Sequence, residues 1–90
     1  MKAFTVHIKG RVQGVCFRYY TREKALQLNI TGWVRNNRDG SVETMICGAD
    51  DTVNVMLKWL EQGPPSANVE GIQIQTLTEE SNLSGFRIVG

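Results

Sequence analysis

Residues 10–18 read Gly-Arg-Val-Gln-Gly-Val-Cys-Phe-Arg, and they separate an alternating run of residues from a run with helical periodicity. Two glycines four positions apart, Gly10 and Gly14, let the backbone turn with positive φ at little cost. A tight loop that feeds a helix directs unpaired N–H groups to one spot, and the helix dipole adds partial positive charge there. The stretch is therefore a candidate anion site.

Arg18 falls in the first turn of the predicted helix, where a cation is poorly placed relative to the helix dipole. An anion bound between Arg18 and the loop would account for this position, since a guanidinium grips two phosphate or carboxylate oxygens at once. The other interpretation is a strand-to-helix turn with a solvent-facing arginine. The stretch alone does not separate the two.

The elements next to the loop follow from the spacing of apolar residues. Residues 3–9 alternate between apolar and polar side chains, which predicts a strand with one buried face. After the loop, one helical stripe recurs at spacings of three and four, namely Phe17, Thr21, Ala25 and Leu28. Asn29 tolerates the left-handed conformation that ends a helix. We expect Tyr19 and Tyr20 to pack over an edge of the core.

The second half of the chain repeats the order of strand, helix and strand. Residues 30–38 and 41–47 predict two strands joined by a hairpin turn at Asp39-Gly40. Asp50 and Asp51 stand where the N-cap and first-turn acid of a second helix belong, and Gly63-Pro64-Pro65 ends it. Two further strands are predicted, one within residues 68–77 and a short one around residues 86–88, with a polar loop at residues 79–84 between them.

This order predicts an α+β fold, the ferredoxin-like βαββαβ sandwich. We expect a mostly antiparallel sheet with two helices on one face and a short extra C-terminal strand. The 90 residues predict a single domain, residues 1–90.

Composition narrows the possible partners and location. No apolar run approaches the roughly 20 residues of a membrane span, and the alternating start is unlike a signal peptide. The formal net charge is +1, from 10 basic and 9 acidic residues, which argues against a broad nucleic-acid-binding face. We expect a cytoplasmic monomer that acts on a small molecule, with no nucleic acid and no membrane as partner.

Few residues could serve as a metal ligand, nucleophile or base. The only histidine, His7, is expected on the exposed side of the first strand, and Cys16 and Cys47 match no zinc spacing, so no metal site is predicted. The sequence leaves open whether these cysteines are thiols or a disulfide. Only one residue separates Cys16 from Arg18, so Cys16 is badly placed as a phosphatase nucleophile. No Ser/His/Asp set is evident.

An anion loop without a base can still hydrolyse one class of phosphate compound. A carboxylate leaving group has a pKa of about 4 and needs no general acid, so the protein must neutralise charge and place a water. A neutral amide can orient that water. Asn36 is a candidate, provided that its strand lies next to the first strand. Asn37 should face the opposite side. The other interpretation is that both are turn-favouring asparagines.

Two motifs resemble those of the acylphosphatases. The family loop reads Gly-x-Val-Gln-Gly-Val-x-Phe-Arg, as at residues 10–18, and its second motif reads Gly-Trp-Val-x-Asn-x-x-Asp-Gly-x-Val-Glu, as at residues 32–43. The helix end at residues 60–65 is also similar, and the likeness covers nearly the whole chain. Asn29 stands where the family often has glycine, and the C-terminus, Phe86-Arg87-Ile88-Val89-Gly90, lacks the aromatic ending seen in many members.

The resemblance implies hydrolysis of acyl phosphates to a carboxylate and inorganic phosphate, without cofactor, metal or phosphoenzyme. It implies that Arg18 and Asn36 are catalytic, with Asn36 orienting the water. It also implies a substrate-binding set formed by Gln13, Gly14, Val15, Cys16, Phe17 and Arg18. Two alternatives remain. One is a phosphate-binding module without turnover, and the other is an RNA binder, which would need aromatic residues on the open sheet face.

Overall fold

The computed structural model describes residues 1–78 and 84–90. The predicted polar loop at residues 79–84 therefore lies, apart from Ser84, outside the described residues. The elements follow in the order β1 (Lys2–Arg11), α1 (Phe17–Gln27), β2 (Thr31–Asn36), β3 (Val42–Gly48), α2 (Asp50–Gln62), β4 (Asn68–Thr76) and β5 (Phe86–Ile88).

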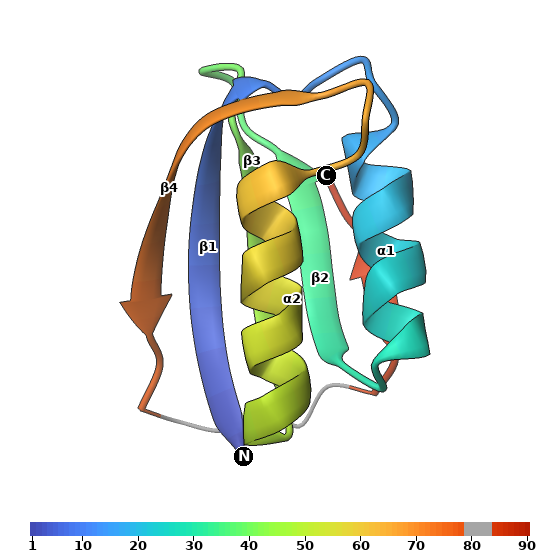
Figure 1. Ribbon diagram of the computed structural model, residues 1–90, viewed down its shortest axis with the longest axis vertical. Helices are drawn as coiled ribbons and strands as arrows, with labels where there is room; N and C mark the ends of the chain where they lie inside the picture. The colour runs from blue at the N-terminus through green and yellow to red at the C-terminus, as the bar shows by residue number, and fades with distance from the viewer. Residues whose placement is uncertain (79–83) are drawn as a thin grey trace.

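One sheet with the strand order β4-β1-β3-β2-β5 forms one layer of the molecule. Its pairs are antiparallel except for β2 and β5, which run parallel. Both helices cover the same face of this sheet (Figure 1). The predicted ferredoxin-like βαββαβ fold with an extra C-terminal strand is confirmed.

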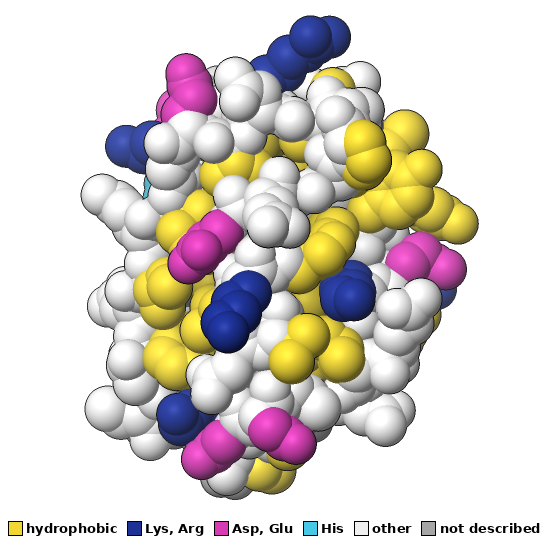
Figure 2. Space-filling view, viewed as in Figure 1, with side chains coloured by type: hydrophobic (Ala, Val, Ile, Leu, Met, Phe, Trp, Pro, Cys, Tyr) yellow, Lys and Arg dark blue, Asp and Glu magenta, His cyan; other side chains and the backbone are white. Residues whose placement is uncertain are grey.

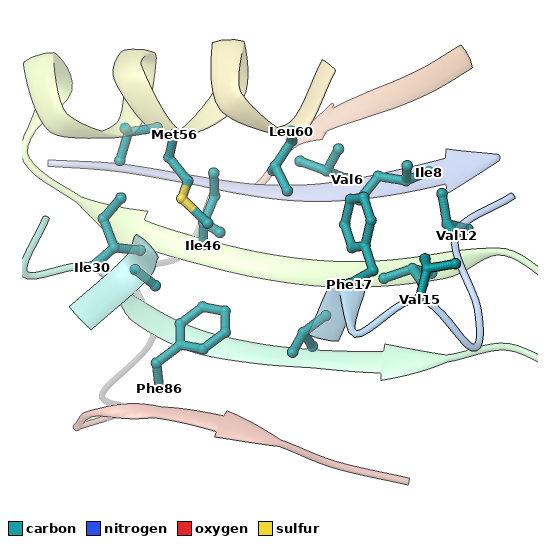
Figure 3. Packing of buried hydrophobic residues seen from close by; sticks show 14 residues of the cluster. Val6, Ile8, Val12, Val15, Phe17, Ile30, Ile46, Met56, Leu60 and Phe86 are labelled. Atoms are coloured by element: carbon teal, nitrogen blue, oxygen red, sulfur yellow. The ribbon is translucent and has the colours of Figure 1, made fainter. Parts of the chain in front are cut away.

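The hydrophobic core lies between the sheet and the two helices (Figure 3). Alternation along the strands sends one side of each strand to this layer, and the helical stripes meet it. The predicted stripe of α1 is buried at Phe17, Thr21 and Ala25. Trp59 of α2 packs on the Phe17 ring, with ring centroids 5.9 Å apart, so the start of α1 is fixed against α2.

The helix ends are largely as predicted, with one exception. Asn29 is left-handed, with φ of 56°, and follows α1, while Gly63 ends α2 with φ of 68°. The prediction of Asp50 as the N-cap of α2 was wrong, because that position is Ala49. The carbonyl of Ala49 accepts the N–H of Val53 at 2.9 Å, so the helix begins one residue earlier. Its first-turn acids still suit the dipole.

The sheet face away from the helices carries a small apolar cluster, Ala3, Met45 and Cys47, with Trp33 and Leu77 packed against it. The guanidinium of Arg35 lies 5.0 Å from the centroid of the Trp33 ring, so this aromatic face is partly covered. Cys16 is exposed, Cys47 is buried, and both are free thiols. Across residues 1–78 and 84–90, every helix is too short or too polar to cross a membrane.

Candidate active site

The topology brings the end of β1, the end of β2 and the start of β3 to the same end of the sheet. Both β1 and β2 run antiparallel to β3, so they run in the same direction. The condition that β2 lies next to β1 is not met, because β3 lies between them. The Gln13 side chain bridges this gap, since its Nε2 donates to the carbonyl oxygens of Asn37 at 2.7 Å and Ser41 at 2.9 Å. Asn36, at the end of β2, therefore lies beside the loop although β3 separates β2 from β1.

Apolar anchors fix the shape of the loop between β1 and α1. Val12, Val15 and Phe17 are all buried in the core, as Figure 3 shows. The residue between the last two anchors, Cys16, is the N-cap of α1 and takes the left-handed conformation, with φ of 61°. This backbone costs a non-glycine residue about 1–3 kcal/mol and persists only where its surroundings impose it.

The loop, α1, β2 and β5 enclose a pocket of about 400 Å³. Arg18 from α1 and Asn36 from β2 both line it, eighteen positions apart in the sequence. The loop contributes Gly14 and Cys16 to the same pocket, and the other lining residues are Val12, Phe17, Tyr19 and Ile88. The structure therefore brings the predicted catalytic pair together.

Two residues of the predicted binding set have side chains directed elsewhere. The amide of Gln13 is bonded to the β2–β3 hairpin, and Val15 belongs to the core. The carbonyl of Val15 accepts the hydroxyl of Ser66 at 2.9 Å, which ties the loop to the segment after α2. Only the backbone of Gln13 and Val15 could therefore take part in binding.

The backbone N–H groups of residues 14–19 make no hydrogen bond to any described residue. The first bond of the helix runs from the N–H of Tyr20 to the carbonyl of Cys16, at 3.1 Å. The first turn of α1 carries no acidic residue, and no side chain within residues 1–78 and 84–90 caps it. Unpaired donors, the helix dipole and the Arg18 guanidinium thus give this end of the pocket positive character.

Asn36 and its neighbour Asn37 face opposite sides of the sheet, as predicted. The side-chain oxygen of Asn36 is buried and has no hydrogen-bond partner among the described residues. In contrast, the Asn37 Nδ2 donates to the hydroxyl of Ser41 at 3.2 Å. An unpaired buried oxygen costs free energy in the folded state, so Asn36 differs from the structural asparagine beside it.

The pocket includes three residues that the predicted site set lacked, namely Val12, Tyr19 and Ile88. Tyr19 was expected over a core edge, but it is 51% exposed and lines the pocket. The Tyr20 ring packs against the Tyr19 ring in a T-shaped arrangement, with ring centroids 5.3 Å apart. Ile88 lines the pocket because β5 pairs with β2, where Ile88 lies opposite Val34. Alternation predicted a strand at Ile88 but not its partner.

A second polar cluster lies on the open sheet face, where no Ser/His/Asp set was expected. The Nε2 of His7 lies 2.5 Å from the hydroxyl of Ser41, which donates to the Asp39 carboxylate. That hydroxyl and the backbone N–H of Ser41 hold the pKa of Asp39 below its ordinary value. Because the serine proton faces aspartate and not histidine, the cluster lacks the proton path of a hydrolytic triad. The described residues contain no group of three metal-ligating side chains.

Comparisons with known proteins agree with this architecture. The family model described as acylphosphatase matches residues 4–88. The acylphosphatase of Rhizobium etli is 47% identical over 99% of this chain and 95% of its own length. The solved acylphosphatase of Bacillus subtilis superposes with a TM-score of 0.96 at 30% identity, over 100% of both chains. That of Coxiella burnetii gives 0.92 at 39% identity, over 98% of this chain and 92% of its own. The chain therefore belongs to the acylphosphatase family of enzymes.

Proposed function

We propose that the enzyme hydrolyses the carboxyl–phosphate bond of small acyl phosphates in the pocket at this end of the sheet. The water oxygen forms a bond to phosphorus, and the bond from phosphorus to the acyl oxygen breaks. The electron pair leaves with the carboxylate, and the proton of the water passes to solvent. The observation that carries the proposal is the presence of Arg18 and Asn36 on the walls of one pocket.

The phosphoryl group would lie between the Arg18 guanidinium and the N–H groups of the loop from Gln13 to Phe17. The unpaired N–H groups of residues 14–19 support this placement, because they need an acceptor. Phosphoryl transfer depends mainly on positioning and on neutralising charge, which this set of donors supplies. Since the leaving carboxylate is a weak base, the step needs no general acid.

Asn36 would hold the attacking water. Its side-chain oxygen has no hydrogen-bond partner among the described residues, so turning the amide by half a turn breaks no hydrogen bond of that oxygen to them. The turn exchanges oxygen and nitrogen and can present the acceptor to the pocket. A neutral amide has no proton to lose in this range, so turnover should vary little between about pH 5 and 8. We also expect no need for a metal, a phosphoenzyme or a second subunit.

Hydrolysis of benzoyl phosphate, followed by its absorbance in the presence of EDTA, tests the proposal. Turnover above the buffer rate is expected, with inorganic phosphate as a competitive inhibitor because product and substrate share the same donors. Phosphate binding without turnover would instead identify a phosphate-binding module. Non-competitive inhibition would contradict the shared placement.

Arg18→Ala should weaken phosphate binding and abolish most turnover. Each charge-assisted hydrogen bond contributes about 1.5–3 kcal/mol, so two of them predict a loss of roughly 100-fold or more in kcat/KM. The matched control is Arg22→Ala on the same helix, whose guanidinium lies 3.5 Å from the Glu23 carboxylate and does not line the pocket. An equal effect of the two variants would contradict the role given to Arg18.

A further inference from the structure

The wall of the pocket beyond the phosphoryl donors is mainly apolar. A pocket of about 400 Å³ is larger than a phosphoryl group needs and falls within the size range of small-molecule sites. Tyr19 and Ile88 line it and are 51% and 42% exposed. Figure 2 shows hydrophobic side chains gathered on the surface over the first half of α1. Exposed apolar surface beside a polar site marks a place where a ligand can bind and cover that surface from water.

The proposed reaction fixes where the remainder of the substrate must lie. If the phosphoryl group is held by Arg18 and the loop, the acyl group has to extend along the other lining residues. On α1, Tyr19 directly follows Arg18, and Ile88 comes from β5 on the other side of β2 from β3. The ring and the branched side chain are the groups that an acyl substituent would contact.

Charge limits which acyl groups fit. Among the described residues, Arg18 is the only cationic side chain that lines the pocket. In the proposed reaction, Arg18 is already bound to the phosphoryl group. A second carboxylate on the acyl group would meet no cation and would lose part of its hydration against Tyr19 and Ile88. An aromatic ring on the acyl group would instead replace its contact with water by contact with the Tyr19 ring, and contacts between aromatic rings are favourable.

We infer that Tyr19, with Ile88, makes this enzyme selective for acyl phosphates whose acyl group is apolar, and aromatic acyl groups above all, over acyl phosphates whose acyl group carries a negative charge. This inference rests on the proposed function. It assigns Tyr19 as a specificity-determining residue, in contact with the acyl group and not with the phosphoryl group.

The test compares kcat/KM for acetyl phosphate, benzoyl phosphate and 4-carboxybenzoyl phosphate. The last two share a ring and differ only in the carboxylate on that ring. Wild type should prefer benzoyl phosphate to both. In Tyr19→Ala the ratio of benzoyl to acetyl should fall by about 3- to 10-fold, the size of one lost aromatic contact, whereas Tyr19→Phe should keep the ratio. Ile88→Ala should lower it in the same direction.

Leu26→Ala is the matched control, because Leu26 lies on the same helix, is 43% exposed and does not line the pocket. Tyr19→Lys should raise the relative rate with 4-carboxybenzoyl phosphate, since it adds the missing cation. Wild type that hydrolyses none of the three substrates would overturn the proposed function. Active wild type whose substrate ratios are the same in Tyr19→Ala, Tyr19→Lys and Leu26→Ala would overturn only the assignment of Tyr19.

Discussion

Gln13 is the side chain that connects the loop to the hairpin after Asn36, and its replacement should loosen both. Its Nε2 donates two half-buried hydrogen bonds, at 2.7 and 2.9 Å, to carbonyl oxygens of Asn37 and Ser41. Each such bond contributes about 0.5–1.5 kcal/mol net, so Gln13→Ala should lower the free energy of unfolding by about 1–3 kcal/mol. For a domain of this size, a loss of about 2 kcal/mol lowers Tm by roughly 8–16 °C.

Urea unfolding, followed by circular dichroism, measures this loss as a lower midpoint at an unchanged m value. The matched control is Gln75→Ala, because Gln75 is exposed on β4 and its side chain makes no hydrogen bond to the described residues. Gln13→Glu should cost more than Gln13→Ala, since it turns a carboxylate oxygen toward two carbonyl oxygens while water can fill the space left by alanine. Both variants should also slow hydrolysis of benzoyl phosphate.

A loss in Gln13→Ala below about 0.5 kcal/mol, the usual range for surface substitutions, would refute this reasoning. So would a glutamate variant as stable as the alanine variant. The first result would mean that water replaces the amide at no cost, and that the loop holds its position through Val12, Val15 and Phe17 alone. The second would mean that a carboxylate at position 13 turns away from the two carbonyl oxygens.

Two further changes test the strand packing and the hairpin. Gly32→Ala should prevent folding, because a Cβ there would lie 1.8 Å from the Met45 carbonyl oxygen, at a φ of +146°. Gly40→Ala is the control, since a Cβ there meets open space, and it should cost only about 1–3 kcal/mol of folding stability. A Gly32→Ala variant that is well folded by circular dichroism would contradict the register of β2 on β3. The pKa of Asp39 is lowered by hydrogen bonds from Ser41, so its stabilisation is present above the ordinary value of 3.8 and is lost as the pH falls through the lower folded-state value. The urea midpoints of wild type and Asp39→Asn should therefore differ at pH 6 and converge in strong acid. A difference between the two midpoints that does not change with pH would contradict a stabilising role of the ionised Asp39 carboxylate.

Local patterns in the sequence predict most of the fold, because each element is short and its apolar spacing is regular. The positive φ of Asn29 and the end of α2 at Gly63 follow from the residue types alone. The start of α2 was misplaced because two acids follow Ala49, and an acid suits the N-cap and the first turn almost equally well.

The parts of the site that depend on pairing between distant strands could not be predicted in this way. His7 and Ser41 meet because β1 and β3 pair with His7 opposite Glu43, a register that no local pattern contains. Ile88 reaches the pocket only through the parallel pairing of β5 with β2. Periodicity placed Tyr19 beside the buried stripe, but whether that position met core or solvent depended on what α1 packs against.

The central claim is that Asn36 acts on the attacking water and not on the phosphoryl group, and one variant separates these roles. In Asn36→Ala, kcat for benzoyl phosphate should fall by about 100-fold or more, the usual cost of losing a positioned polar group. The dissociation constant of inorganic phosphate, measured by calorimetry, should stay within about twofold of wild type. Asn37→Ala, whose side chain faces Ser41, should keep most of kcat. Equal losses of turnover and phosphate binding in Asn36→Ala, or retained turnover, would contradict the account.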